Sequence, residues 1–129
     1  ETALRVASAL AGNDSVASVA YPGLPTDASY ELSRKLLGGA GGGTLGFEVA
    51  GGRERTKRFQ DLLEVITPAS SLGGTHSLLV HAASVTHTQL NAEQLHAAQI
   101  SEGYCRLSVG LEAPNDLMAD IDQALARSA

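Results

Sequence analysis

The fold is decided by Tyr104-Cys105-Arg106-Leu107-Ser108-Val109-Gly110-Leu111, whose residues alternate in polarity as those of a half-buried β-strand do. This period of two predicts a core-facing set, which comprises Cys105, Leu107, Val109 and Leu111, and an opposite set, which comprises Tyr104, Arg106, Ser108 and Gly110. Arg106 therefore stands on the polar face of the strand. The nearest acidic residue on that face is Glu102, roughly 13 Å away at about 3.3 Å per residue. The strand itself offers Arg106 no ion-pair partner.

A second stretch, Pro68-Ala69-Ser70-Ser71-Leu72-Gly73-Gly74, complements that arginine. The glycine pair permits φ > 0 and hence a tight turn, and we expect Ser70 and Ser71 to lie at the end of an extended segment. A guanidinium can hold a carboxylate through two parallel hydrogen bonds, with a nearby hydroxyl completing the site. The two stretches are therefore interpreted as one carboxylate-binding site. The alternative for Arg106 is a cross-strand or inter-domain salt bridge.

Composition restricts the class of protein. The 129 residues are enough for one domain with a core, and no apolar run approaches the ~18 residues of a membrane span. A net charge of −5 gives no electrostatic support for a nucleic-acid or anionic-membrane partner. The single cysteine, Cys105, excludes an internal disulfide and fits a reducing, cytoplasmic setting. Because Met118 is the only methionine, we expect the sequence to be a piece of a longer chain.

Helical and extended patterns alternate along the chain. The expected strands are residues 16–20, 44–49, 77–81 and 104–111, with a short extended segment at 64–67. The expected helices are residues 1–11, 27–37, 53–64, a short one through 97 and a last one that starts at 114. Asn91, followed three residues later by Gln94, resembles a capping box for the short helix. The second helix should be capped by Thr26 and bury Leu32, Leu36 and Leu37. Short connections predict an α+β fold, a small antiparallel sheet covered by helices.

Two other patterns resemble binding sites. Gly41, Gly43 and Gly46 have the spacing G-x-G-x-x-G of a phosphate cradle. A helix precedes them and a strand follows, whereas a dinucleotide site needs the reverse order, so a turn and an edge strand are favoured. The charge run at residues 53–58 is interpreted as a solvated helix face rather than a basic binding patch.

Other candidate reactive groups are interpreted as structural or exposed. The histidines at 76, 81, 87 and 96 lack a common metal-ligand spacing, so no metal site is predicted. Cys105 should be a buried structural thiol, and Ser71 lacks the G-x-S-x-G elbow of a hydrolase nucleophile. Asp120 and Asp122 are expected to be solvated on the last helix.

Several motifs resemble one known family. They are Val19-Ala20-Tyr21-Pro22-Gly23-Leu24, Gly46-Phe47-Glu48-Val49, Ser71-Leu72-Gly73-Gly74, Val85-Thr86-His87, the run from Arg106 to Glu112, and residues 116–125. Nearly the whole chain resembles the C-terminal small domain of the Cys/Met-metabolism family of pyridoxal-phosphate enzymes. That family includes cystathionine γ-synthase, cystathionine γ-lyase, methionine γ-lyase and O-acetylhomoserine sulfhydrylase. The resemblance implies that residues 1–129 form a single substrate-carboxylate-binding domain of a fold-type-I enzyme.

The resemblance also implies roles for individual residues. Arg106 would grip the substrate α-carboxylate, and Ser71 would assist there. Ser70 stands where the family selects the substrate side chain, often with Glu for cystathionine and an apolar residue for methionine. Thr86 matches a threonine near the pocket, although Val85 replaces the usual Met.

The family's Schiff-base lysine belongs to a large domain that is absent from this chain. Lys35 and Lys57 fall on polar helix faces, so no catalytic or cofactor-binding residue is predicted here and the fragment alone should be inactive. The implied whole is a cytoplasmic homotetramer that binds pyridoxal phosphate in its large domain. It would act by β/γ-elimination or γ-replacement on a sulfur amino acid or an activated homoserine. The alternative is a non-catalytic binding or assembly module that retains this fold.

Overall fold

The computed structural model describes residues 1–84, 89–98 and 100–129. Its centre is a five-stranded sheet in the order β1-β2-β5-β4-β3. The strands are β1 (Val16–Ala20), β2 (Thr44–Val49), β3 (Thr67–Pro68), β4 (Leu78–His81) and β5 (Tyr104–Ser108). All neighbouring pairs are antiparallel except β3 and β4, which are parallel. The alternating stretch thus forms the central strand, β5.

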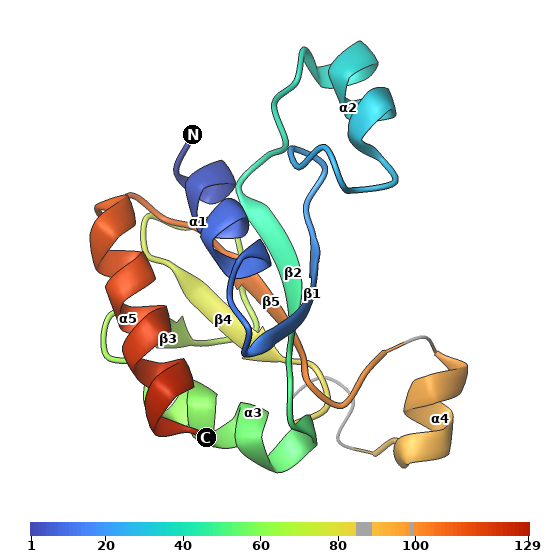
Figure 1. The fold of residues 1–129 in the computed structure, drawn as a ribbon, viewed down its shortest axis with the longest axis vertical. Helices are drawn as coiled ribbons and strands as arrows, with labels where there is room; N and C mark the ends of the chain where they lie inside the picture. Colours follow the sequence, from blue (N-terminus) through green and yellow to red (C-terminus); the bar gives the residue numbers. More distant parts are fainter. Residues whose placement is uncertain (85–88, 99) are drawn as a thin grey trace.

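The helices are α1 (Thr2–Ala11), α2 (Tyr30–Leu37), α3 (Gly52–Asp61), α4 (Ala92–Ala97) and α5 (Pro114–Arg127). In Figure 1, α1, α3 and α5 pack together against the sheet, whereas α2 and α4 stand away from it at opposite ends of the molecule. The predicted α+β class, an antiparallel sheet covered by helices, is confirmed. None of the helices in the described parts of the chain has the length and apolar character that a bilayer span requires.

The core lies between the sheet and the packed helices. Phe47 of β2 meets Phe59 of α3 edge to face, with ring centroids 6.0 Å apart. Cys105 and Leu107 are fully buried, as the alternation predicts. Leu111 is 82% exposed, so its predicted burial is wrong. The reason is that β5 ends at Ser108, after which the chain leaves the sheet toward α5.

Helix α2 differs most from its prediction. It begins at Tyr30 rather than near 27, and Ser29, not Thr26, is its N-terminal flanking residue. The carboxylate of Asp27 accepts a hydrogen bond from the Ser29 N–H at 2.8 Å, and this local turn delays the helix. The prediction that its leucines are buried is wrong. The exposed fractions of Leu32, Leu36 and Leu37 are 59%, 72% and 59%. They are exposed because the helix stands clear of the sheet (Figure 1).

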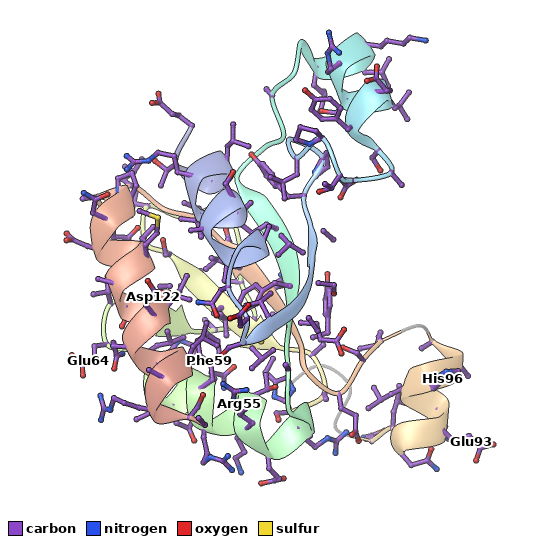
Figure 2. All side chains as sticks on the ribbon, viewed as in Figure 1. Arg55, Phe59, Glu64, Glu93, His96 and Asp122 are labelled. Atoms are coloured by element: carbon purple, nitrogen blue, oxygen red, sulfur yellow. The ribbon has the colours of Figure 1, made fainter. Side chains whose placement is uncertain are left out.

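The basic run on α3 is not simply a solvated face. The guanidinium of Arg55 donates to the carbonyl oxygens of Ala50 at 2.9 Å and Leu125 at 3.3 Å. Arg58 donates to the Ser128 carbonyl at 2.9 Å. Two of these acceptors, the carbonyls of Leu125 and Ser128, lie at the C-terminal end of α5, where a cation is favourable. Figure 2 shows Arg55 beside Phe59 on α3, which ends at Asp61 instead of residue 64.

Asp120 also departs from the sequence interpretation. Expected to be solvated, it is only 4% exposed. Its carboxylate accepts hydrogen bonds from the main-chain N–H groups of Glu64, Val65 and Ile66, at 2.8, 3.0 and 2.9 Å. Burial alone would raise the pKa of Asp120, but these N–H groups outweigh it, and the pKa lies below its ordinary value. Asp120 therefore holds the segment that leads into β3.

Candidate carboxylate-binding site

Arg106 lies at the middle of the sheet. Its register partners are Gly46 on β2 and Val80 on β4, and neither has a polar side chain. Because Cys105 and Leu107 point into the core, Arg106 points to the opposite face of the sheet. The central strand thus positions the guanidinium on a face with apolar flanks.

The guanidinium reaches the bend that contains the two predicted serines. Its Nη2 donates to the carbonyl oxygen of Ser70 at 2.6 Å and lies 3.4 Å from that of Ser71. The predicted proximity of the two stretches is therefore present in the structure. The contacts use main-chain oxygens, not the serine hydroxyls, and both serines are exposed. The hydroxyls are consequently left on the solvent side of the bend.

Arg106 keeps unused binding capacity. Guanidinium has five N–H donors, and the Arg106 Nε is buried without a hydrogen-bond partner among the described residues. Neither of the two ion pairs found in the described ranges involves Arg106. The salt-bridge alternative therefore has no partner in these parts of the chain. A cation with spare donors beside exposed hydroxyls is suited to an incoming carboxylate.

The same face is shaped by Tyr104, whose ring covers Gly46. A Cβ on Gly46 would collide with the phenol oxygen of Tyr104, so this close approach requires glycine. The aromatic ring and the buried Val80 give Arg106 apolar surroundings on both sides. Such surroundings strengthen a charge-assisted hydrogen bond by lowering the local dielectric.

The remaining predicted residues fall into three groups. Thr86 lies outside the described residues, as do Val85 and His87. Cys105 is 0% exposed and burial raises the pKa of its thiol, as expected for a structural cysteine. The structure groups no three His, Cys, Asp or Glu side chains as a metal site among the residues it describes.

His81 has a structural environment that the sequence did not reveal. It is 0% exposed. Its Nε2 lies 2.7 Å from the Glu102 carbonyl oxygen, and its Nδ1 lies 2.7 Å from the Ser84 hydroxyl. Burial is the largest influence on this imidazole and lowers its pKa. We interpret His81 as a neutral link between β4 and the segment that precedes β5.

Sequence reasoning missed the residues that hold the bend in place. Gly73 has φ +78°, as the predicted turn requires, and its N–H donates to the Ser108 hydroxyl at 2.9 Å. Farther along, Ser77 bonds to Glu112 through both its N–H and its hydroxyl. These contacts join residues 35 positions apart, which no local pattern reports. The signal available in the sequence was that all four residues lie inside the two quoted stretches or within three residues of their ends.

The residues present do not fit a pyridoxal-phosphate site. A Schiff-base lysine needs a desolvated amine, whereas Lys35 and Lys57 are both exposed on helices. Neither lysine therefore offers the desolvated amine that a Schiff base requires.

Comparison with known proteins decides the family. The profile described as Cys/Met metabolism PLP-dependent enzyme matches residues 1–126. The chain belongs to this family. It is 40% identical over 124 residues to the O-acetyl-L-homoserine sulfhydrylase of Leptospira meyeri, covering 95% of this chain and 28% of that protein. It is 42% identical over 120 residues to the L-methionine gamma-lyase of Pseudomonas deceptionensis, covering 93% and 30%.

Solved structures agree with the sequence relatives. The cystathionine gamma synthase from Xanthomonas oryzae pv. oryzae, solved in complex with cystathionine, superposes with a TM-score of 0.86 at 38% identity. The match covers 98% of this chain and 33% of that one. This family member thus spans about a third of the length of the relatives that it matches.

Proposed function

We propose that this chain is the C-terminal, substrate-carboxylate-binding domain of a pyridoxal-phosphate-dependent enzyme. The whole protein would carry out β/γ-elimination or γ-replacement on a sulfur amino acid or an activated homoserine. One observation carries the proposal, namely the guanidinium of Arg106, which reaches the Ser70–Ser71 bend without an acidic partner in the described ranges. Family membership and the activities named for the relatives support it.

In this proposal each residue acts by binding and orientation. Arg106 holds the substrate α-carboxylate in a two-point contact, and the Ser71 hydroxyl donates to the same carboxylate. Ser70 faces the substrate side chain, and Thr86, which lies outside the described residues, is assigned to substrate binding by the family resemblance alone. Fixing the carboxylate fixes the orientation of the Cα–H bond, so that the base supplied elsewhere in the protein meets it in one geometry. Pyridoxal phosphate is held by the large domain of the same protein.

The proposal extends to the assembly of the whole protein. As in the family that the sequence resembles, we propose a homotetramer in which this domain packs on the large domain of its own polypeptide. The free and buried thiol of Cys105 supports a reducing, cytoplasmic compartment.

The test is Arg106→Lys in the complete protein. An ammonium cannot reproduce the two-point contact, so kcat/KM for the amino-acid substrate should fall on the order of 100-fold. Arg5→Lys is the matched control, because Arg5 is exposed and donates to Asn115 on the helical side of the molecule. Near-normal kcat/KM for Arg106→Lys would overturn the carboxylate role. A complete protein that binds no pyridoxal phosphate would favour the non-catalytic module instead.

A further inference from the structure

A set of hydrogen bonds, here called the clasp, joins the serine bend to the end of the central strand. The N–H of Gly73 donates to the Ser108 hydroxyl at 2.9 Å. The N–H of Leu111 donates to the carbonyl oxygen of Thr75, also at 2.9 Å. The clasp therefore begins two residues after Arg106 on one side and two residues after Ser71 on the other.

Glu112 is the charged centre of the clasp. Its Oε1 accepts a hydrogen bond from the Ser77 N–H at 2.6 Å, and its Oε2 accepts one from the Ser77 hydroxyl at 2.7 Å. That hydroxyl accepts in turn from the Gly110 N–H at 2.9 Å. One carboxylate thus satisfies both donors of Ser77, which is 0% exposed. Charge-assisted bonds of this kind are the strong ones in proteins.

The environment of Glu112 keeps it ionised. Partial burial on its own would raise the pKa of its carboxyl group, but the N–H and hydroxyl of Ser77, together with the N–H of Glu112 itself and the nearby His76, bring the pKa below its ordinary value. The charged form is the one that accepts both bonds, so the closed clasp and the ionised carboxylate favour each other.

We propose that Glu112 is a positioning residue, which through Ser77 sets the distance between the Arg106 guanidinium and the Ser70–Ser71 bend. Among the described residues no hydrogen bond joins Glu112 to Arg106, Ser70 or Ser71, so Glu112 would act on the substrate only through the clasp. This inference rests on the proposed function, because the distance between Arg106 and the serine bend matters only if both contact the same substrate carboxylate. The ligand concerned is the α-carboxylate of an amino acid.

The experiment compares Glu112→Gln and Ser77→Ala in the complete protein. A glutamine has a single acceptor oxygen for two Ser77 donors, so the bend should loosen and KM should rise about ten-fold, with a smaller change in kcat. Glu93→Gln is the matched control, since Glu93 is exposed on α4 and points away from the rest of the molecule (Figure 2). The substitution at Glu93 should leave KM unchanged.

A combined variant separates positioning from general destabilisation. If Glu112 acts through the carboxylate contact, Glu112→Gln should cost little further kcat/KM once Arg106 is replaced by lysine. Equal fold-losses in both backgrounds would overturn the inference, as would a loss that tracks thermal stability alone. If Arg106→Lys is severely impaired while Glu112→Gln has normal KM, only the clasp inference fails. If Arg106→Lys is normal, the proposed function itself fails.

An independent observation concerns the leucine face of α2, defined as Leu32, Leu36 and Leu37. Their exposed fractions of 59%, 72% and 59% are high for three leucines on one short helix. A groove of about 210 Å³ runs along this face and is lined by Pro22, Ser29, Leu32, Ser33, Leu36 and Leu37. Contiguous apolar surface of this kind marks an interaction site.

We infer that the leucine face packs against the large domain of the same polypeptide. The chain spans only 28% to 33% of the relatives, so most of their length has no counterpart in it. In Figure 1, α2 and the N-terminus both lie toward the upper end of the molecule, and the C-terminus lies at the lower end. In the proposed function a large domain joins this one through its N-terminus, which lies in the same upper half of the molecule as α2 (Figure 1).

The test is a Leu32→Ser/Leu36→Ser variant of the complete protein, studied by hydrogen exchange and light scattering. Amide exchange in α2 should accelerate while the oligomeric mass stays constant. Glu31→Gln is the control, because Glu31 has a 76% exposed side chain on the same helix. Unchanged exchange would overturn the inference. A fall in oligomeric mass would also overturn it, by assigning the face to a second copy of the chain. This test does not depend on the kinetics of Arg106→Lys, so the domain contact at α2 and the carboxylate site can be contradicted separately.

Discussion

The carboxylate of Asp120 on α5 accepts a hydrogen bond at 2.9 Å from the main-chain N–H of Ile66, 54 residues earlier in the chain. The N–H groups of Glu64 and Val65 converge on the same carboxylate. The buried Asp120 carboxylate thus provides the hydrogen-bond acceptors that the irregular segment 64–66 lacks within its own main chain. It also fixes where the chain enters β3, and so where the bend at Ser70 begins.

Replacement of Asp120 by asparagine should lower the free energy of unfolding by about 2 kcal/mol or more, because the amide group turns a donor toward at least one N–H. Asp122→Asn is the control, since Asp122 is exposed and its carboxylate accepts one hydrogen bond, from the Asn13 side-chain amide at 3.2 Å. Its effect should remain within roughly 0.5 kcal/mol. Chemical denaturation at pH 7 measures both, and equal effects would contradict the capping role.

The same comparison has a pH dependence of known sign. Because the folded-state pKa of Asp120 is lowered, its ionised form stabilises the fold above the ordinary carboxyl pKa of about 4. This stabilisation is lost as the pH falls through the lower folded-state value. The difference in unfolding free energy between wild type and Asp120→Asn should therefore shrink below about pH 4. A constant difference would show that the charge plays no part.

The buried His81 should make the folded protein less stable as the pH falls below about 6.5. Burial lowers its folded-state pKa, so between that value and about 6.5 the unfolded chain binds more protons than the folded one. Stability should be complete above about pH 6.5 and decline as the pH falls. Urea denaturation of wild type and His81→Gln between pH 5 and 8 tests this. The unfolding free energy of the variant should depend less steeply on pH than that of the wild type. An identical pH dependence would exclude His81 as its source.

Gly110 should not tolerate a side chain. A Cβ there would meet the carbonyl oxygen of Thr75, and the carbonyl carbon of His76 at 2.5 Å. Since these are main-chain atoms, Gly110→Ala should cost about 1–3 kcal/mol of stability. Gly43→Ala is the matched control, because its Cβ would have ordinary contact with the Val109 oxygen at 3.8 Å. Thermal melts should separate the two, and similar melting temperatures would contradict the close packing.

Cys105 should react with thiol reagents only after unfolding. The side chain is 0% exposed and burial raises the pKa of its thiol, so both access and thiolate formation are suppressed. Peptide-level mass spectrometry of labelling in native buffer and in denaturant measures this. Rapid labelling of the native protein would contradict the burial of this face of β5.

The parts of the fold that the sequence predicted correctly depend on local periodicity and capping. The alternation at residues 104–108 gave the central strand, and the Asn91–Gln94 capping box is present at α4. Both patterns are complete within a few residues, so they do not depend on contacts with distant parts of the chain.

The errors arise where a distant partner decides the environment. Asp120 is expected to be solvated because it lies with Asp122 on the last helix, whereas its three main-chain donors lie more than fifty positions away. Leu36 was expected to be buried because it lies on an amphipathic helix, yet the described chain places no core beneath α2. For the site, sequence placed Arg106 beside Ser70 and Ser71, but not the link from Glu112 to Ser77.

The alternation of β5 separates two kinds of selection along one strand. Changes at positions 105 and 107 alter how much protein accumulates, since Cys105 and Leu107 fill the interior. If the proposed function holds, changes at position 106 should instead alter the activity of the protein that accumulates. In a deep mutational scan that scores abundance and growth separately, substitutions at 105 and 107 should therefore lower abundance, whereas substitutions at 106 should lower growth at normal abundance. Substrate preference could then drift at the surface of this sheet without the interior having to change.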